Sequence, residues 1–230
     1  MCGIVGIYLK TKKLEKNLGK MLSGMLNNME SRGPDSAGFA IYKNEGNKIY
    51  KFSICINYLN FNVFKKELSK KIKKIKLNQI SDHVILRTEE KPKKVIEIIN
   101  SNFPEVSIVG YGKSIEIFKQ VGNPKDVVKK FKLGEFSGTH GIGHTRMATE
   151  SAITTDGSHP YSTGEDECLV HNGSLSNHNN LRRELTKKGN IFNSENDTEV
   201  AAGYISHNLS NKKSLKDTLT SGLKDLDGFY

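Results

Sequence analysis

The sequence contains no tryptophan, and its 230 residues include only three cysteines and five prolines. The cysteines, Cys2, Cys55 and Cys168, are far apart and odd in number, which argues against a disulfide framework and against a zinc site. No apolar run reaches the roughly 18 residues that suggest a membrane span. The first apolar segment is short and follows no basic segment, unlike a secretory signal. These absences predict a cytoplasmic protein without a membrane partner.

The chain is basic, with a net charge of +10, and has the 36% hydrophobic and 26% charged residues of a globular protein. Much of the positive charge lies between residues 65 and 76. There Phe64, Leu68, Ile72 and Ile75 recur at helical spacing, so the lysines fill the opposite face of an amphipathic helix. We find no recognition-helix or RNA-binding motif. The pattern favours a solvated helix face over a nucleic-acid-binding patch, and no nucleic-acid partner is predicted.

The order of predicted elements indicates one domain with an insertion. Its first part comprises a buried strand at 3–8, a helix at 14–30, a polar glycine-rich loop at 31–38 and a strand at 39–42. Residues 43–138 have the character of a small inserted α+β unit. Its expected elements are strands at 49–58, 82–88, 106–111 and 115–121 and helices at 62–78, 91–102 and 124–132.

His140 and His144 are four residues apart, a spacing that on a helix could bind zinc. The glycines around them argue against a helix, and no glutamate follows the first histidine. The sequence therefore predicts no metal site.

Cys2 becomes the first residue of the chain if Met1 is removed, and it then carries a thiol and a free α-amine. A thiolate is a strong nucleophile, and a terminal amine titrates near neutrality and can serve as its base. Taken alone, however, the start Met1-Cys2-Gly3 favours a small buried cysteine. The chemistry of this residue depends on what lies downstream.

Two downstream segments bear on that chemistry. The run 168–170 is expected to be a buried strand that delivers His171-Asn172-Gly173 into a turn. An asparagine amide beside a glycine N–H can form a two-donor oxyanion hole, although Asn-Gly alone is more typical of a hairpin turn. Residues 193–199 have the composition of a helix start, which on propensity alone makes Asp197 a cap.

In combination and in this order, the motifs resemble the class II glutamine amidotransferases, a family of N-terminal-nucleophile hydrolases. The motifs are Cys2-Gly3-Ile4-Val5-Gly6, Ser31-Arg32-Gly33-Pro34-Asp35, Gly143-His144-Thr145-Arg146-Met147-Ala148-Thr149, His171-Asn172-Gly173 and Asn196-Asp197-Thr198-Glu199. The resemblance covers residues 1–42 and 138–230. The longer segment 138–179 is most similar to the glutamate-synthase-type subgroup, which includes the glutaminase subunit of N-methylglutamate synthase.

The resemblance implies an α+β fold, a four-layer α/β/β/α sandwich with two antiparallel sheets. It makes Cys2 the nucleophile, with its own amine as base, and gives the oxyanion hole to Asn172 and Gly173. The thiolate would attack the glutamine side-chain amide, and water would hydrolyse the resulting γ-glutamyl thioester. Family domains continue beyond Tyr230, so the resemblance also implies an incomplete domain with an exposed sheet edge.

The substrate-binding residues also follow from the resemblance. Arg146 would hold the α-carboxylate of glutamine, for which a guanidinium fork is suited, and Asp197 would hold the α-ammonium. Thr149 and His159 correspond to positions near the substrate, and Arg32 to a loop that closes the site. Glu150, where many family members have another residue, receives no role.

Three functions are consistent with these patterns. The first is a glutaminase that needs no cofactor of its own and passes ammonia to a separate synthase subunit, which in this subgroup carries a flavin. The second is an N-terminal-nucleophile hydrolase of another amide, which Arg146 and Asp197 argue against because together they suit the two charges of an amino acid. The third is a non-catalytic regulatory or basic binding module.

Overall fold

The main sheet of the computed structural model contains four antiparallel strands in the order β1-β8-β2-β7. The structure describes residues 2–44, 46, 48–57, 59–148 and 152–229. The strands are β1 (Gly3–Tyr8), β8 (His140–Arg146), β2 (Ser36–Tyr42) and β7 (Ile115–Val121). Gly3 pairs with Thr145, and Ser36 pairs with both Arg146 and Val121. Strands from both ends of the first 146 residues, β1 and β8, are therefore neighbours in one sheet, with β1 at its edge.

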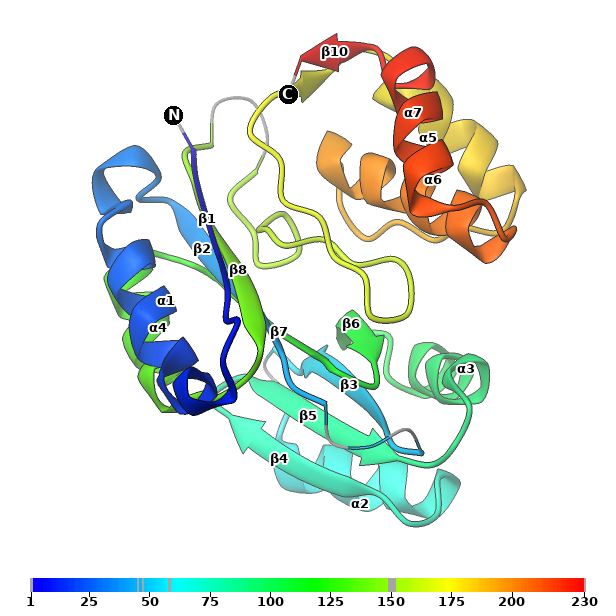
Figure 1. The fold of residues 1–230 in the computed structure, drawn as a ribbon. Coiled ribbons are helices and arrows are strands. Elements are labelled where there is room, and N and C mark those ends of the chain that lie inside the picture. The colour runs from blue at the N-terminus through cyan, green and yellow to red at the C-terminus, as the bar shows by residue number, and fades with distance from the viewer. Residues whose placement is uncertain (1, 45, 47, 58, 149–151, 230) are drawn as a thin grey trace.

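Two helices, α1 (Leu18–Asn27) and α4 (Pro124–Lys130), cover one face of this sheet (Figure 1). Leu18, Leu22 and Leu26 form the fully buried stripe of α1, in the same apolar cluster as Phe39 and Phe118 of the sheet. The prediction of a helix within residues 14–30 is confirmed, but the α-helix begins only at Leu18, and the 3-10 segment η1 (Lys12–Asn17) precedes it. A second 3-10 turn, η2 (Glu30–Arg32), follows it, and a third, η3 (Leu133–Glu135), follows α4.

The inserted unit has its own antiparallel sheet in the order β4-β5-β3-β6. Its strands are β3 (Tyr50–Cys55), β4 (Lys76–Ile80), β5 (His83–Thr88) and β6 (Ser107–Gly112), and its helices are α2 (Phe61–Lys71) and α3 (Pro92–Asn102). Phe64 and Leu68 of α2 are buried, as the amphipathic pattern predicts. The prediction of a helix to residue 78 is wrong, because Ile72 is already extended and Lys74 has a positive φ of 54°. The chain turns there and returns as the edge strand β4.

The segment predicted as one insertion, 43–138, divides between the two sheets. β7 pairs with β2 in the main sheet, and α4 packs there. The separate sheet spans residues 50–112. Glu116 on β7 joins the two parts, because its carboxylate lies 3.3 Å from the buried Lys51 amine and 2.6 Å from the Arg87 guanidinium. We call these three side chains the junction ion cluster.

The remaining described chain lies on the face of the main sheet opposite α1 (Figure 1). It begins with an irregular segment at 152–173, continues through β9 (Ser174–Leu175), α5 (His178–Lys187), α6 (Asp197–Ser210) and α7 (Leu215–Asp225), and ends at β10 (Gly228–Phe229). β10 pairs antiparallel with β9. None of the described helices is long and apolar enough to cross a membrane. The predicted α+β class with antiparallel sheets is confirmed, and the β9–β10 ladder lies between the main sheet and α5–α7.

Candidate functional site

Cys2 lies at the end of β1, where side chains from three segments meet. Because Gly3 pairs with Thr145, the register places Cys2 beside the end of β8. Its Sγ is 3.8 Å from the Met147 carbonyl oxygen. The Cys2 carbonyl oxygen accepts hydrogen bonds from Arg32 Nε and from Asn172 Nδ2, each at 3.2 Å. Three of the predicted site residues, separated by up to 170 positions in the sequence, are therefore in contact.

The loop that carries Arg32 is fixed to the end of β8. Asp35 N donates to Arg146 O at 3.1 Å, and Asp35 Oδ2 accepts from Ala148 N at 2.7 Å. Gly33 packs so closely that a Cβ there would lie 2.4 Å from a backbone carbonyl carbon of β8. Asp35 lies in one of the recognised motifs, but its residue type alone predicted no role. In the structure it holds the loop in place, so that the exposed Arg32 reaches the Cys2 backbone.

The loop 171–173 presents its amide groups beside Cys2. The strand expected at 168–170 is wrong, because only Leu169 pairs, in an isolated bridge with Tyr161. The chain still turns at His171-Asn172-Gly173, and the Asn172 side chain is exposed. A Cβ at Gly173 would lie 2.0 Å from Phe229 O, so this close approach requires glycine. Asn172, one of the two predicted oxyanion-hole residues, is therefore in contact with the predicted nucleophile.

Two predicted substrate-binding residues lie on elements next to this loop. Arg146 is buried at the end of β8, and its Nη1 donates to Ala152 O at 3.3 Å. Asp197 is the first residue of α6, and its Oδ2 accepts from Leu175 N at 2.8 Å. The prediction that Asp197 caps the helix is wrong, because Asn196 is the N-cap and its side chain accepts from Thr198 N.

The remaining substrate-binding predictions lie elsewhere. Thr149 and Glu150 fall outside the residues that the structure describes. His159 is buried at 4% exposure, its Nε2 is 3.0 Å from Thr198 Oγ1, and its ring stacks on that of His144 with centroids 3.9 Å apart. Burial lowers the pKa of His144 to about 4 and the pKa of His159 well below its usual value. Both rings are therefore neutral at physiological pH.

The stacked rings belong to a polar cluster that we call the histidine–threonine cluster, comprising His144, His159, His171 and Thr198. His171 Nδ1 lies 3.2 Å from Thr198 Oγ1, and His144 Nε2 donates to His171 O at 3.1 Å. Neither Thr198 nor His144 is among the catalytic and substrate-binding residues predicted from the sequence. Strand alternation offered one signal, since His144 and Arg146 are two residues apart and point to the same face of β8.

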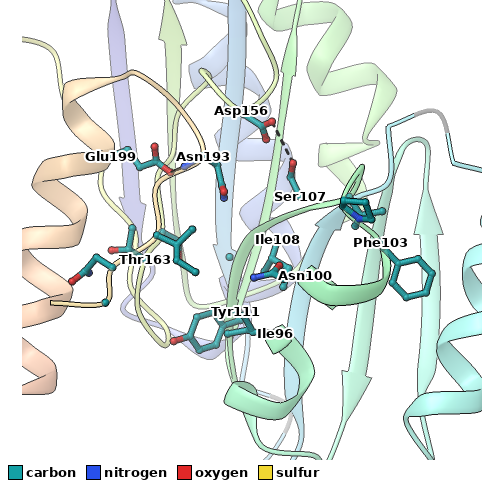
Figure 2. Close-up of a pocket in the computed structure, with 17 residues that line it drawn as sticks. Ile96, Asn100, Phe103, Ser107, Ile108, Tyr111, Asp156, Thr163, Asn193 and Glu199 are labelled. Atoms are coloured by element: carbon teal, nitrogen blue, oxygen red, sulfur yellow. Dashed lines mark hydrogen bonds between the residues drawn. The ribbon is translucent and has the colours of Figure 1, made fainter. Parts of the chain in front are cut away.

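A cavity of about 650 Å³ lies between the inserted unit and the main domain (Figure 2). Residues of α3 and β6 line one side, and parts of segments 156–163 and 189–199 line the other. Ser107 Oγ and Asp156 Oδ2 are hydrogen-bonded across it at 3.2 Å. No predicted site residue lines it. Among the described residues there is also no group of three or more histidine, cysteine, aspartate or glutamate side chains that could hold a metal ion.

Comparisons with known proteins agree with the motifs. Residues 134–209 match a family model described as a glutamine amidotransferase domain. The glutamine amidotransferase-like protein GlxB of Rhizobium meliloti (strain 1021) is 48% identical over 233 residues, which cover all of this chain and 77% of that protein. A glutamine–fructose-6-phosphate aminotransferase (isomerizing) of Pseudomonas putida is 44% identical over 112 residues, which cover 49% of this chain and 18% of that protein.

The fold resembles that of the glutamine phosphoribosylpyrophosphate amidotransferase from B. subtilis. The TM-score is 0.57 at 18% sequence identity, and the match covers 99% of this chain and 33% of that one. This similarity shows that the chain shares its fold with part of that amidotransferase. With GlxB nearly half identical along the whole chain, the protein is an enzyme of the glutamine amidotransferase family.

Proposed function

We propose that this protein hydrolyses glutamine to glutamate and ammonia with Cys2 as the nucleophile. The observation that carries the proposal is the meeting of Arg32 and Asn172 at the Cys2 backbone, next to the thiol. Removal of Met1 frees the α-amine of Cys2, whose pKa is expected near 8, so that it accepts the thiol proton close to neutral pH.

The thiolate attacks the side-chain carbonyl carbon of glutamine, and the carbonyl oxygen becomes an oxyanion. Asn172 Nδ2 carries two hydrogens, of which the bond to Cys2 O uses one. The other, together with the Gly173 N–H, is our proposed donor pair for the oxyanion. Collapse of this intermediate breaks the C–N bond, and the amine of Cys2 returns its proton to the departing ammonia. Water then hydrolyses the γ-glutamyl thioester and restores the thiol.

Arg146 and Asp197 supply charges suited to the two ends of an amino acid. Because Gly3 pairs with Thr145, Cys2 lies opposite Arg146 at the end of β8, and we assign Arg146 the α-carboxylate. Asp197 is held near the loop 171–173 by the hydrogen bond that Leu175 N donates to its carboxylate, and we assign it the α-ammonium. Thr149 and His159 complete the proposed substrate set, and Arg32 is the proposed closing residue.

We further propose that the ammonia passes to a separate synthase subunit of the glutamate-synthase or N-methylglutamate-synthase type. The chain itself would need no cofactor, and the partner would carry a flavin. The support is the motif similarity of segment 138–179 to that subgroup. If the proposal is right, adding the synthase subunit and its acceptor accelerates glutamine hydrolysis, and glutamine replaces free ammonia as nitrogen donor.

The test of the nucleophile is the intact mass before and after reaction with a diazo-ketone analogue of glutamine. The protein is first treated with methionine aminopeptidase until the mass shows loss of Met1. We expect a single adduct that glutamine blocks and that Cys2→Ala abolishes. Cys168→Ser is the matched control and keeps the adduct, because burial raises the pKa of the Cys168 thiol to about 11.

The same preparation separates the alternative functions. Glutamine turnover that exceeds turnover of simple amides supports the proposal, whereas equal turnover indicates a hydrolase of another amide. An adduct that persists in Cys2→Ala, or a processed protein that neither labels nor turns over glutamine, contradicts the assignment of Cys2.

A further inference from the structure

We infer that Thr198 is a positioning residue that holds the oxyanion loop 171–173 and the proposed ammonium-binding Asp197 in register with each other. The inference rests on the proposed function and adds a residue to it. Thr198 is the second residue of α6, and its side chain is 1% exposed. Its hydroxyl oxygen lies 3.0 Å from His159 Nε2, 3.2 Å from His171 Nδ1 and 3.3 Å from Asp197 Oδ1.

The hydrogen-bond directions follow from which atoms carry protons. Phe229 O can only accept, so His171 Nε2, at 3.3 Å from it, carries a hydrogen and donates it. His171 Nδ1 and Asp197 Oδ1 can then only accept, so they share the single hydroxyl hydrogen of Thr198 in a three-centre bond. His159 Nε2 donates to the same hydroxyl oxygen. The hydroxyl is thus both donor and acceptor, and an isosteric methyl group cannot replace it in either role.

These bonds fix the first residue of the oxyanion loop. Both ring nitrogens of His171 have partners, and its carbonyl oxygen accepts from His144 Nε2. Asn172 and Gly173 follow without an intervening residue, so the orientation of their amides depends on His171. A buried polar group that loses its partner destabilises the arrangement that buries it, so losing the Thr198 hydroxyl shifts the loop toward other conformations.

Thr198 also belongs to the Asp197 side of the site. Asp197 Oδ2 is held by Leu175 N, which lies two residues beyond Gly173 in β9. Asp197 Oδ1 faces the Thr198 hydroxyl. The loop and the carboxylate therefore share two connections, one through β9 and one through Thr198. Glutamine bound between them would have its reacting amide and its α-ammonium set by the same hydroxyl.

The experiment compares Thr198→Val, which removes the hydroxyl at constant shape, with Thr198→Ser, which keeps it. Thr218→Val is the matched control, because Thr218 is fully buried and its hydroxyl has no hydrogen-bond partner among the described residues. For each protein we measure kcat and KM for glutamine and for its analogue without the α-amino group. Rates are normalised to the fraction of sites labelled by the diazo-ketone, and urea unfolding is measured in parallel.

We expect Thr198→Val to lower kcat for glutamine by about 10- to 100-fold, somewhat less than removal of an oxyanion-hole donor itself. The ratio of kcat/KM for glutamine to kcat/KM for the deaminated analogue should also fall, because Asp197 loses its contact with the Thr198 hydroxyl. Thr198→Ser should stay within about threefold of wild type, since it makes the same bonds. Thr218→Val should leave both kinetic values unchanged.

A purely structural role gives a different result. Thr198→Val would then lower the urea midpoint or the labelled fraction while kcat per labelled site and the substrate preference stayed at wild-type values, and this would overturn the inference. The outcome differs from failure of the proposed function, in which the processed wild-type protein itself does not hydrolyse glutamine. That second result would overturn both.

Discussion

Acid should destabilise this protein through the stacked rings of His144 and His159. Both side chains are buried, at 0% and 4% exposure, and their rings are 3.9 Å apart. Burial is the main reason that the pKa of His144 falls, and the nearby positive charge of Arg146 lowers it further. A proton on either ring would place a cation in a dry site beside another ring, so the folded protein keeps both rings neutral.

The size of the effect follows from the difference in pKa between the two states. The pKa of His144 is about 4 in the folded protein, against 6.5 for an unperturbed histidine. Below pH 6.5 the unfolded chain therefore binds a proton that the folded state does not bind. The resulting loss of stability from His144 is about 2 kcal/mol at pH 5 and about 3 kcal/mol at pH 4, relative to pH 7.5. His159 acts in the same direction and adds to the loss.

The assay is urea unfolding of the wild type and of His144→Gln at several pH values between 7.5 and 5. The wild type should lose stability as the pH falls, and the variant should lose less, so that the difference between them shrinks by about 2 kcal/mol. His207→Gln serves as control, because it removes a partly exposed histidine of α6 and keeps the buried pair. A wild-type-minus-variant difference that stays constant over this range would refute the reasoning.

Three further predictions concern packing and buried charge. Gly19→Ala should lower the free energy of unfolding by about 1–3 kcal/mol or more, because its Cβ would lie 2.1 Å from Leu133 O. Gly24→Ala lies in open space on the same helix and should raise the free energy of unfolding by about 0.5–1 kcal/mol. Urea unfolding measures both. Burial lowers the pKa of Lys119 from 10.5 to about 8, so between these pH values the unfolded state binds more protons than the folded state. The free energy of unfolding of the wild type, relative to that of Lys119→Met, should therefore rise by about 3 kcal/mol between pH 7 and pH 10.5. Glu116→Gln removes the carboxylate of the junction ion cluster and should lower the free energy of unfolding, measured with urea, by about 3 kcal/mol. The loss should be equal at high and low salt concentration, because the cluster is shielded from solvent.

Local periodicity predicted the helices and most strands, since each depends on a face that its own residues define. The stripe of α1 and the two-faced pattern of α2 appear in the structure as buried Leu22 and buried Leu68. The end of α2 could not be predicted in this way. Ile75 and Leu77 continue an apolar spacing that suits a helix, yet both pack on the insertion core from a strand and its preceding turn. Both arrangements bury the same side chains, and tertiary contacts decide between them.

The place of β7 could not be predicted for a related reason. Its sequence is as typical of an insertion strand as of a main-sheet strand, and its partner β2 lies more than 70 residues earlier in the chain. Pairing at that distance depends on which edge is open. The buried Lys119 shows the consequence, because its amine donates to Asp156 O and Ser158 O in a segment that only the folded sheet brings near.

The residues of the site also fall into two groups, those that motif similarity identified and those whose role only the folded structure shows. Motif similarity identified Cys2, Arg32 and Asn172, and the structure brings their atoms into contact. Three members of the histidine–threonine cluster, His144, His171 and Thr198, lie within the recognised motifs, but their supporting role follows only from their contacts in the folded structure. Thr198 directly follows Asp197, and His144 precedes Arg146 by two residues, so each strand or helix that presents a substrate-binding side chain also presents a supporting one. Substitutions at the supporting positions should therefore change the geometry of the site while the residues with predicted catalytic or substrate-binding roles are all kept, and motif matching alone does not make this distinction.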